Sequence, residues 1–222
     1  MKQLGALVLI FGWIAASGPA RADDTTALDQ EIAQLQHEWA RIKYKVSDED
    51  RQLAQMDALA GRADIVVGHY PDRAEPLVWD AIITSTAAGM SSGFRALGKA
   101  KAARKMLLAA EKIDAKVLDG SVYTSLGSLY YQVPGFPLGF GSKKKARKYL
   151  EKALTLNPDG IDPNYFYGDF LFRRHEYAQA ARVLTHALKA RPRPTRPIAD
   201  QGRRQEINDL LAKVQKHLQR AS

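Results

Sequence analysis

The chain has 222 residues, with 33 lysines and arginines against 24 aspartates and glutamates, and a formal net charge of +9. Hydrophobic residues make up 45% of it, enough for one folded domain with an ordinary core, which excludes a low-complexity or disordered chain. The absence of cysteine excludes disulfides and lipid attachment through a cysteine thiol.

The N-terminus is predicted to be a secretory signal peptide covering residues 1–22. Lys2 precedes an apolar run over residues 4–16, and Ala20 and Ala22 have the small-x-small spacing of a cleavage site. The alternative, a retained membrane anchor, lacks a basic stop-transfer flank, and the apolar run is short for a stable span. We therefore expect an exported, periplasmic protein with no membrane anchor after cleavage.

Residues 23–70 are predicted to form two helices that pack on the rest of the domain. The first has an apolar stripe that steps alternately by four and three residues and must be buried. The stripe comprises Leu28, Ile32, Leu35, Trp39, Ile42 and Val46. It packs either on the following helices or on the same helix of a second chain, so oligomerisation stays open. Ser47, followed by an acidic turn, predicts the N-cap of the second helix, which ends near His69, and a third helix is expected from Pro76 to about Met90.

Residues 71–192 contain a repeated pattern of small and large apolar side chains. In three stretches a small residue is followed four positions later by a large apolar one and three positions after that by an alanine, which places all three on one helix face. The stretches begin at Ala102, Ala146 and Ala180. The last two stretches begin 34 residues apart. The prolines that follow them, Pro158 and Pro192, are also 34 residues apart. A fixed period of this length predicts a solenoid of helix pairs.

The segments before the last two alanine stretches also match each other. Their shared positions are Tyr123, Leu126, Gly127 and Tyr130 in one copy and Asn164, Tyr167, Gly168 and Leu171 in the other. These features resemble the tetratricopeptide repeat family, whose unit is a 34-residue helix pair with small residues where the helices touch. The resemblance implies an all-α fold, an α-solenoid of antiparallel helix pairs, with about three pairs in residues 71–192 and a peptide or protein partner bound in a concave groove.

Residues 193–222 are predicted to be a basic proline linker followed by a capping helix. Residues 193–197 read Arg-Pro-Thr-Arg-Pro, an extended basic segment that no helix can cross. An apolar stripe follows at Ile207, Leu210, Leu211, Val214 and Leu218. A helix with this stripe would cover the last exposed apolar face of a solenoid.

The segment between Tyr130 and Lys143 is the first candidate binding site. Its apolar side chains Phe136, Leu138 and Phe140 alternate with prolines and glycines, whereas polar residues would suffice to join two helices. The two phenylalanines are predicted either to meet a partner or to fold back over the core, and the two roles are compatible. The predicted contacts are Tyr131, Phe136 and Phe140, with Lys143, Lys144 and Lys145 as a weaker electrostatic rim.

The aromatic block of residues 165–170 is the second candidate. Consecutive helical residues point about 100° apart, so its aromatic side chains cannot all face the core. Tyr165 and Asp169 are one turn apart and are predicted to form a polar tip over an apolar floor, suited to a peptide or a small organic ligand. Asp162 followed by Pro163 predicts the N-cap and first residue of this helix.

The sequence shows no motif typical of an enzyme. Its histidines are scattered without a metal-binding pair, and it has neither a Gly-x-Ser-x-Gly elbow nor a phosphate-binding glycine loop. Asp159, Asp162 and Asp169 lack the spacing of a calcium loop. We therefore expect no catalytic activity, no metal and no cofactor, and a hydrolase that uses Asp162 or Asp169 is a minor alternative.

The leading interpretation is an exported, non-catalytic binding or scaffold protein of the cell envelope that recognises a peptide or protein. Export argues against nucleic acid as the partner, and the lysines over residues 99–105 and 143–148 are expected to be mainly solvated helix faces. The alternative is a periplasmic ligand-binding accessory of a transport system, because residues 123–156 are similar to the helical T-components of tripartite periplasmic (TRAP) transporters. A closed pocket lined by the Phe136 loop would favour that alternative, and an open groove would favour partner binding.

Overall fold

The computed structural model describes residues 20–221 of the chain, with side chains described for residues 25–220. The predicted signal peptide, residues 1–22, lies almost entirely outside the described residues. The described part forms nine helices and no strand, which confirms the all-α prediction. The helices are α1 (Ala20–Lys45), α2 (Glu49–His69), α3 (Ala74–Gly89), α4 (Gly93–Ile113), α5 (Val117–Gln132), α6 (Lys143–Leu156), α7 (Ile161–Arg173), α8 (Tyr177–Ala187) and α9 (Pro197–Ala221).

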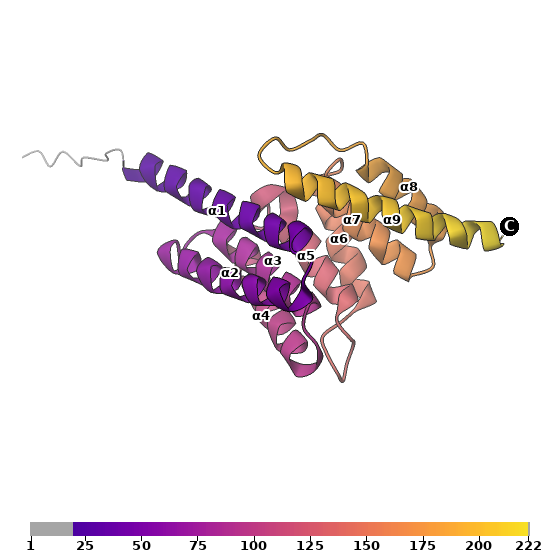
Figure 1. Ribbon diagram of the computed structural model, residues 1–222, viewed down its shortest axis with the longest axis horizontal. Helices are drawn as coiled ribbons and strands as arrows, with labels where there is room; N and C mark the ends of the chain where they lie inside the picture. Colours follow the sequence, from indigo (N-terminus) through magenta and orange to yellow (C-terminus); the bar gives the residue numbers. More distant parts are fainter. Residues whose placement is uncertain (1–19, 222) are drawn as a thin grey trace, which may run out of the picture.

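Helices that follow each other in the sequence pack side by side (Figure 1). The closest packing joins α3 to α4, α5 to α6 and α7 to α8. The first helix of each of these pairs also contacts the first helix of the next, so that α5 touches both α3 and α7, and α7 touches α9. This stacking of consecutive pairs gives a solenoid-like arrangement. The stretches that begin at Ala146 and Ala180 are buried as predicted. The prediction for Ala102 is wrong by one residue, because the buried face of α4 carries Ala103, Leu107 and Ala110.

Two glycines explain how closely the paired helices approach. A Cβ atom on Gly127 of α5 would lie 2.6 Å from Cγ of Leu150 on α6. A Cβ atom on Gly168 of α7 would lie 2.6 Å from Cγ of Leu184 on α8. Both leucines are fully buried, so the same pair of residue types makes the same contact in two successive helix pairs.

The apolar stripe of α1 is buried within its own chain. All six stripe residues are less than one-tenth exposed, and α1 packs on α2, α3 and α9. The Trp39 ring meets the Trp79 ring edge-on with centroids 6.0 Å apart, and Trp39 Nε1 donates to Thr86 Oγ1 at 2.9 Å. Pairing of this stripe with a second chain would therefore require α1 to leave these helices.

The N-cap of α2 lies one residue later than the sequence pattern indicates. Asp48, and not Ser47, occupies the capping position, and its carboxylate accepts a hydrogen bond from Arg51 N at 2.7 Å. A carboxylate at this position satisfies a free backbone N–H and complements the helix dipole as well.

The C-terminal helix α9 covers α7 and α8, as expected of a capping helix, and also contacts α1 (Figure 1). Ile207 and Val214 are fully buried on its inner face. Lys43 of α1 pairs with Glu206 of α9 at 2.9 Å, so the N-terminal and C-terminal helices are linked directly. Within residues 20–221 no helix is both long enough and apolar enough to cross a bilayer.

Candidate functional site

The segment 133–142 between α5 and α6 is a closed loop that projects from the helix pairs (Figure 1). Its base is held by backbone hydrogen bonds, from Ser142 N to Tyr130 O at 2.7 Å and from Gly141 N to Pro134 O at 2.8 Å. Any side chain at Gly141 would collide with the carbonyl oxygen of Val133. The loop is therefore a defined structure, and the glycine at its base is needed for the chain to close.

The two phenylalanines of this loop have different roles. The Phe140 ring packs edge-on against Tyr130, with centroids 5.8 Å apart, and the Arg104 guanidinium of α4 lies 4.3 Å from its centre. Phe136 is 94% exposed and Leu138 is 73% exposed. Phe140 therefore fastens the loop to the core, whereas Phe136 and Leu138 are presented to solvent. The sequence left open, for both phenylalanines, whether the ring folds back over the core or meets a partner. In the structure Phe140 folds back and Phe136 faces solvent.

A third exposed apolar side chain lies on the same edge of the molecule. Stacked antiparallel pairs place every second turn on one side, so the turn between α3 and α4 shares an edge with the loop 133–142 (Figure 1). Phe94, the second residue of α4, is 95% exposed. We call the surface made by Phe94, Phe136, Leu138, Lys143 and Lys144 the loop edge. Exposed aromatic groups gathered in this way are typical of interaction sites.

The start of α6 adds positive charge to the loop edge. The Ser142 hydroxyl caps the helix by accepting from Lys145 N at 3.3 Å, and all three lysines of the predicted rim are exposed. Lys145 Nζ lies 5.3 Å from the centre of the Tyr130 ring, which leaves Lys143 and Lys144 free to face solvent. They also line a shallow hollow of about 380 Å³ beside the loop. Its lining residues are Lys143, Lys144, Arg147, Lys148, Glu151, Phe170 and Arg174, with five cations and one carboxylate.

Tyr131 and Asp169 are bonded to each other beneath the surface. The Tyr131 hydroxyl donates to Asp169 Oδ2 at 2.7 Å, and Arg173 Nε donates to the same oxygen at 3.0 Å. Burial, with the Asp169 charge adding to it, raises the pKa of Tyr131 well above its usual value. Asp169 is 9% exposed, so the prediction of an open polar tip at this residue is wrong. The bond instead ties α5 to α7.

Tyr165 lies under a cation from α9. The Arg203 guanidinium is 4.2 Å from the centre of the Tyr165 ring and covers the face that the sequence assigned to a ligand. Burial raises the pKa of Tyr165 to about 12. The structure therefore does not bring Tyr165 together with the loop edge. Of the predicted contacts, it gathers Phe136 with the α6 lysines and places Tyr131, Tyr165 and Asp169 in the packing between helices.

Asp162 forms partly buried ion pairs with two arginines and does not cap α7. The capping residue is Gly160, and α7 begins at Ile161, so the predicted N-cap is wrong. Asp162 Oδ2 lies 2.7 Å from Arg193 Nη1, and Oδ1 lies 2.8 Å from Arg203 Nε. Burial alone would raise the pKa of Asp162, but the charges of the surrounding arginines outweigh burial and hold the pKa below its usual value.

The three aspartates considered for a calcium site or a hydrolase each have a protein partner. Asp159 lies 2.9 Å from His186 Nε2, while Asp162 and Asp169 make the arginine and tyrosine contacts described above. Across the described residues, no three His, Asp or Glu side chains converge as a metal ion would require. Their carboxylates link helices and turns that are distant in sequence.

Comparison with known proteins identifies no relative: no protein-family model matches the sequence, and no curated protein is significantly similar to it. The resemblance to tetratricopeptide repeats thus rests on residue spacing and on the helix-pair contacts at Gly127 and Gly168.

Proposed function

We propose that this chain is an exported, non-catalytic binding protein of the cell envelope, with tetratricopeptide-like helix pairs, that docks a protein partner through the loop edge. The observation that carries the proposal is the exposure of Phe136 and Leu138, which are 94% and 73% exposed on a loop fastened at its base by backbone hydrogen bonds. Export is proposed from the sequence pattern of residues 1–22.

The fixed loop favours binding because little conformational freedom remains to be lost. Ordering a mobile side chain at an interface costs roughly 0.5–1.5 kcal/mol, and a loop already held by Phe140 and by its backbone hydrogen bonds avoids part of this cost. Burying the exposed Phe136 ring in a pocket of a partner would contribute roughly 1.5–3 kcal/mol. A single aromatic anchor of this kind is typical of an interaction hot spot.

The charge next to the loop indicates the chemistry of the partner. The hollow beside α6 is lined by five cationic groups and one carboxylate. Arg147 and Arg174 are paired with Glu176, and the three lysines that remain favour an acidic segment. We therefore expect a partner with an apolar pocket for Phe136, flanked by Asp and Glu side chains. The side chains of the loop edge project outward, a geometry that suits insertion into another protein better than enclosure of a small molecule.

Photo-crosslinking in cells tests the position of this surface. A photoreactive amino acid replaces Phe136, Phe94 or, as a matched control, Ile65, which is 58% exposed on α2. We expect crosslinks to one common partner from positions 136 and 94 and none to that partner from position 65. The absence of any adduct at position 136, or the same adduct at all three positions, would overturn the proposal.

A further inference from the structure

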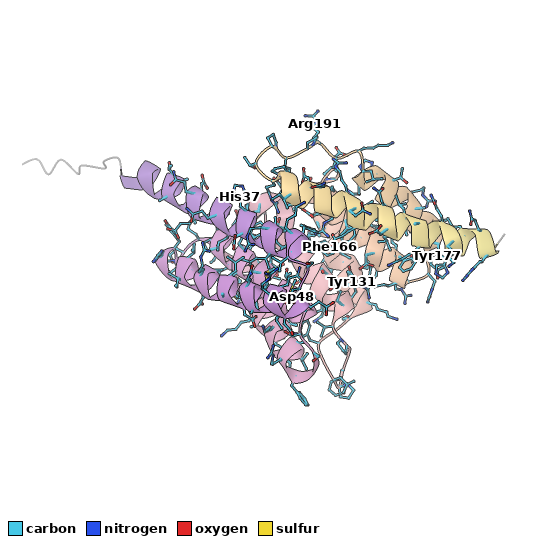
Figure 2. All side chains as sticks on the ribbon, in the orientation of Figure 1. His37, Asp48, Tyr131, Phe166, Tyr177 and Arg191 are labelled. Carbon is cyan, nitrogen blue, oxygen red and sulfur yellow. The ribbon has the colours of Figure 1, made fainter. Side chains whose placement is uncertain are left out.

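A cavity of about 620 Å³ lies on the side of the molecule opposite the loop edge. It is an open cavity bordered by α1, α3, the start of α5, the turn between α6 and α7 with the start of α7, the end of α8, and the segment 189–196 that leads into α9. Figure 2 shows Arg191, on that segment, far from the loop 133–142 at the other edge. The volume is in the range of sites for small organic ligands.

Arg196 lines this cavity without a carboxylate of its own. Its side chain makes no hydrogen bond or ion pair with another described residue, and its buried Nε atom has no acceptor. Its guanidinium lies 5.0 Å from the centre of the Trp79 ring, a contact that orients the group without neutralising it. Burial is the main effect that lowers the pKa of Arg196; the charges of Asp162 and Asp200 oppose it, and those of Arg193 and Arg203 add to it.

Asp162 and Asp200, the carboxylates whose charges act on Arg196, are already engaged by other cations, and Asp119 and Asp159 also line the cavity. Asp162 binds Arg193 and Arg203, and Asp200 binds Arg193 through its Nη2 atom at 2.6 Å. Glu206 binds Arg203 and Lys43. The whole group comprises the cations Lys43, Arg193, Arg196 and Arg203 and the carboxylates Asp162, Asp200 and Glu206. The four cations outnumber the three carboxylates by one. Arg196, which lines the cavity, is the cation that has no ion pair with another described residue.

A second buried donor on the cavity wall is also unused. Trp79 is 3% exposed, and its indole Nε1 has no hydrogen-bond acceptor. Burying a donor without an acceptor is unfavourable, but Trp79 Nε1 and Arg196 Nε are themselves shielded from the cavity. The terminal nitrogens of Arg196 are not buried and make no hydrogen bond with a described residue, so they are the donors that a ligand with its own acceptor atoms can reach. The remaining wall includes apolar surface from Leu118, Ile161 and Ala190, which suits an organic body attached to the acceptor group.

We propose that this cavity binds a small organic anion whose oxyanion headgroup, a carboxylate or a phosphate, pairs with Arg196 and whose body lies against the apolar wall. The guanidinium offers parallel N–H donors that match either headgroup. The inference is independent of partner docking at the loop edge, because the two surfaces share no residue.

Isothermal titration calorimetry of the full chain with three probes tests the proposal. Benzoate and phenyl phosphate carry the two candidate headgroups on the same ring, and benzamide is a neutral control of similar size. We expect saturable binding of at least one anion and none of benzamide. The preferred anion decides between carboxylates and phosphate esters. Failure of both anions to bind, or equal binding of benzamide, would overturn the proposal.

Variants assign the binding to the cavity. Arg196→Gln is expected to weaken anion binding by at least about 10-fold, the loss typical of one charge-assisted hydrogen bond. Arg182→Gln on α8 makes the same charge change at an exposed position outside the cavity and is expected to leave affinity within about twofold, the scale of an exposed charge. Circular dichroism confirms that each variant is folded. Equal weakening by Arg196→Gln and Arg182→Gln would show nonspecific attraction and overturn the assignment.

Discussion

Replacing Gly168 with alanine tests whether the helices of a pair meet where the repeat places its small residues. Alanine is favoured over glycine within a helix by about 1 kcal/mol. Here, however, the new Cβ atom would lie 2.6 Å from both Cγ and Cδ2 of Leu184, which is fully buried and cannot move without disturbing its neighbours. Overpacking of this kind costs about 1–3 kcal/mol. We therefore expect a net loss of about 1 kcal/mol in the free energy of unfolding.

Gly98→Ala is the matched control, because Gly98 lies inside α4 and a Cβ atom there would have nothing within 4 Å. It is expected to gain about 0.5–1 kcal/mol, which makes a difference of about 2 kcal/mol between the variants. Urea unfolding followed by circular dichroism measures this directly, and the melting temperatures should differ by about 4–8 °C. If Gly168→Ala were as stabilised as Gly98→Ala, the close contact in the α7–α8 pair would be refuted.

Four further substitutions test other contacts. Asp162→Asn is expected to cost about 1.5–3 kcal/mol in urea unfolding at neutral pH, because the buried Arg203 and the half-buried Arg193 lose their shared carboxylate but keep Glu206 and Asp200. Phe140→Ala is expected to cost about 1–3 kcal/mol, since the partly buried ring fastens the loop, whereas Phe136→Ala should change stability by less than about 0.5 kcal/mol. Burial raises the pKa of Asp80 to about 6, so its protonated form favours folding below pH about 4 and that contribution is lost as the pH rises through 6. Asp80→Asn should therefore melt at a higher temperature than the wild type at neutral pH, and the gap should close in melts at acidic pH.

The helix pairs were predictable because the residues that form their contacts recur at short, regular spacing. Gly127 with Leu150 and Gly168 with Leu184 occupy equivalent positions in two copies, so one copy supports the other. The burial of the α1 stripe was also predictable from its spacing, since an apolar face that long must be covered. Its contact with α9 was not, because nothing in either segment specifies which distant helix covers it.

The candidate site was only partly predictable, because its geometry depends on how the chain turns. Phe136 and Phe140 have similar sequence surroundings, and the loop closure at Gly141 determines which ring folds back and which faces solvent. Asp162 looked like a helix cap because its partners, Arg193 and Arg203, lie 31 and 41 residues away, with no spacing rule connecting them. The arginine-proline segment consequently looked like a linker, although it borders a cavity.

The affinity of the crosslinked partner, once purified, is the measurement that tests the central claim most directly. Its dissociation constant is compared between the wild type, a Phe136→Ser and Leu138→Ser double variant, and an Ile65→Ser control. We predict at least about 10-fold weaker binding for the double variant, unchanged binding for the control, and weaker wild-type binding at high salt. Equal affinity of the wild type and the double variant would contradict docking through the loop edge.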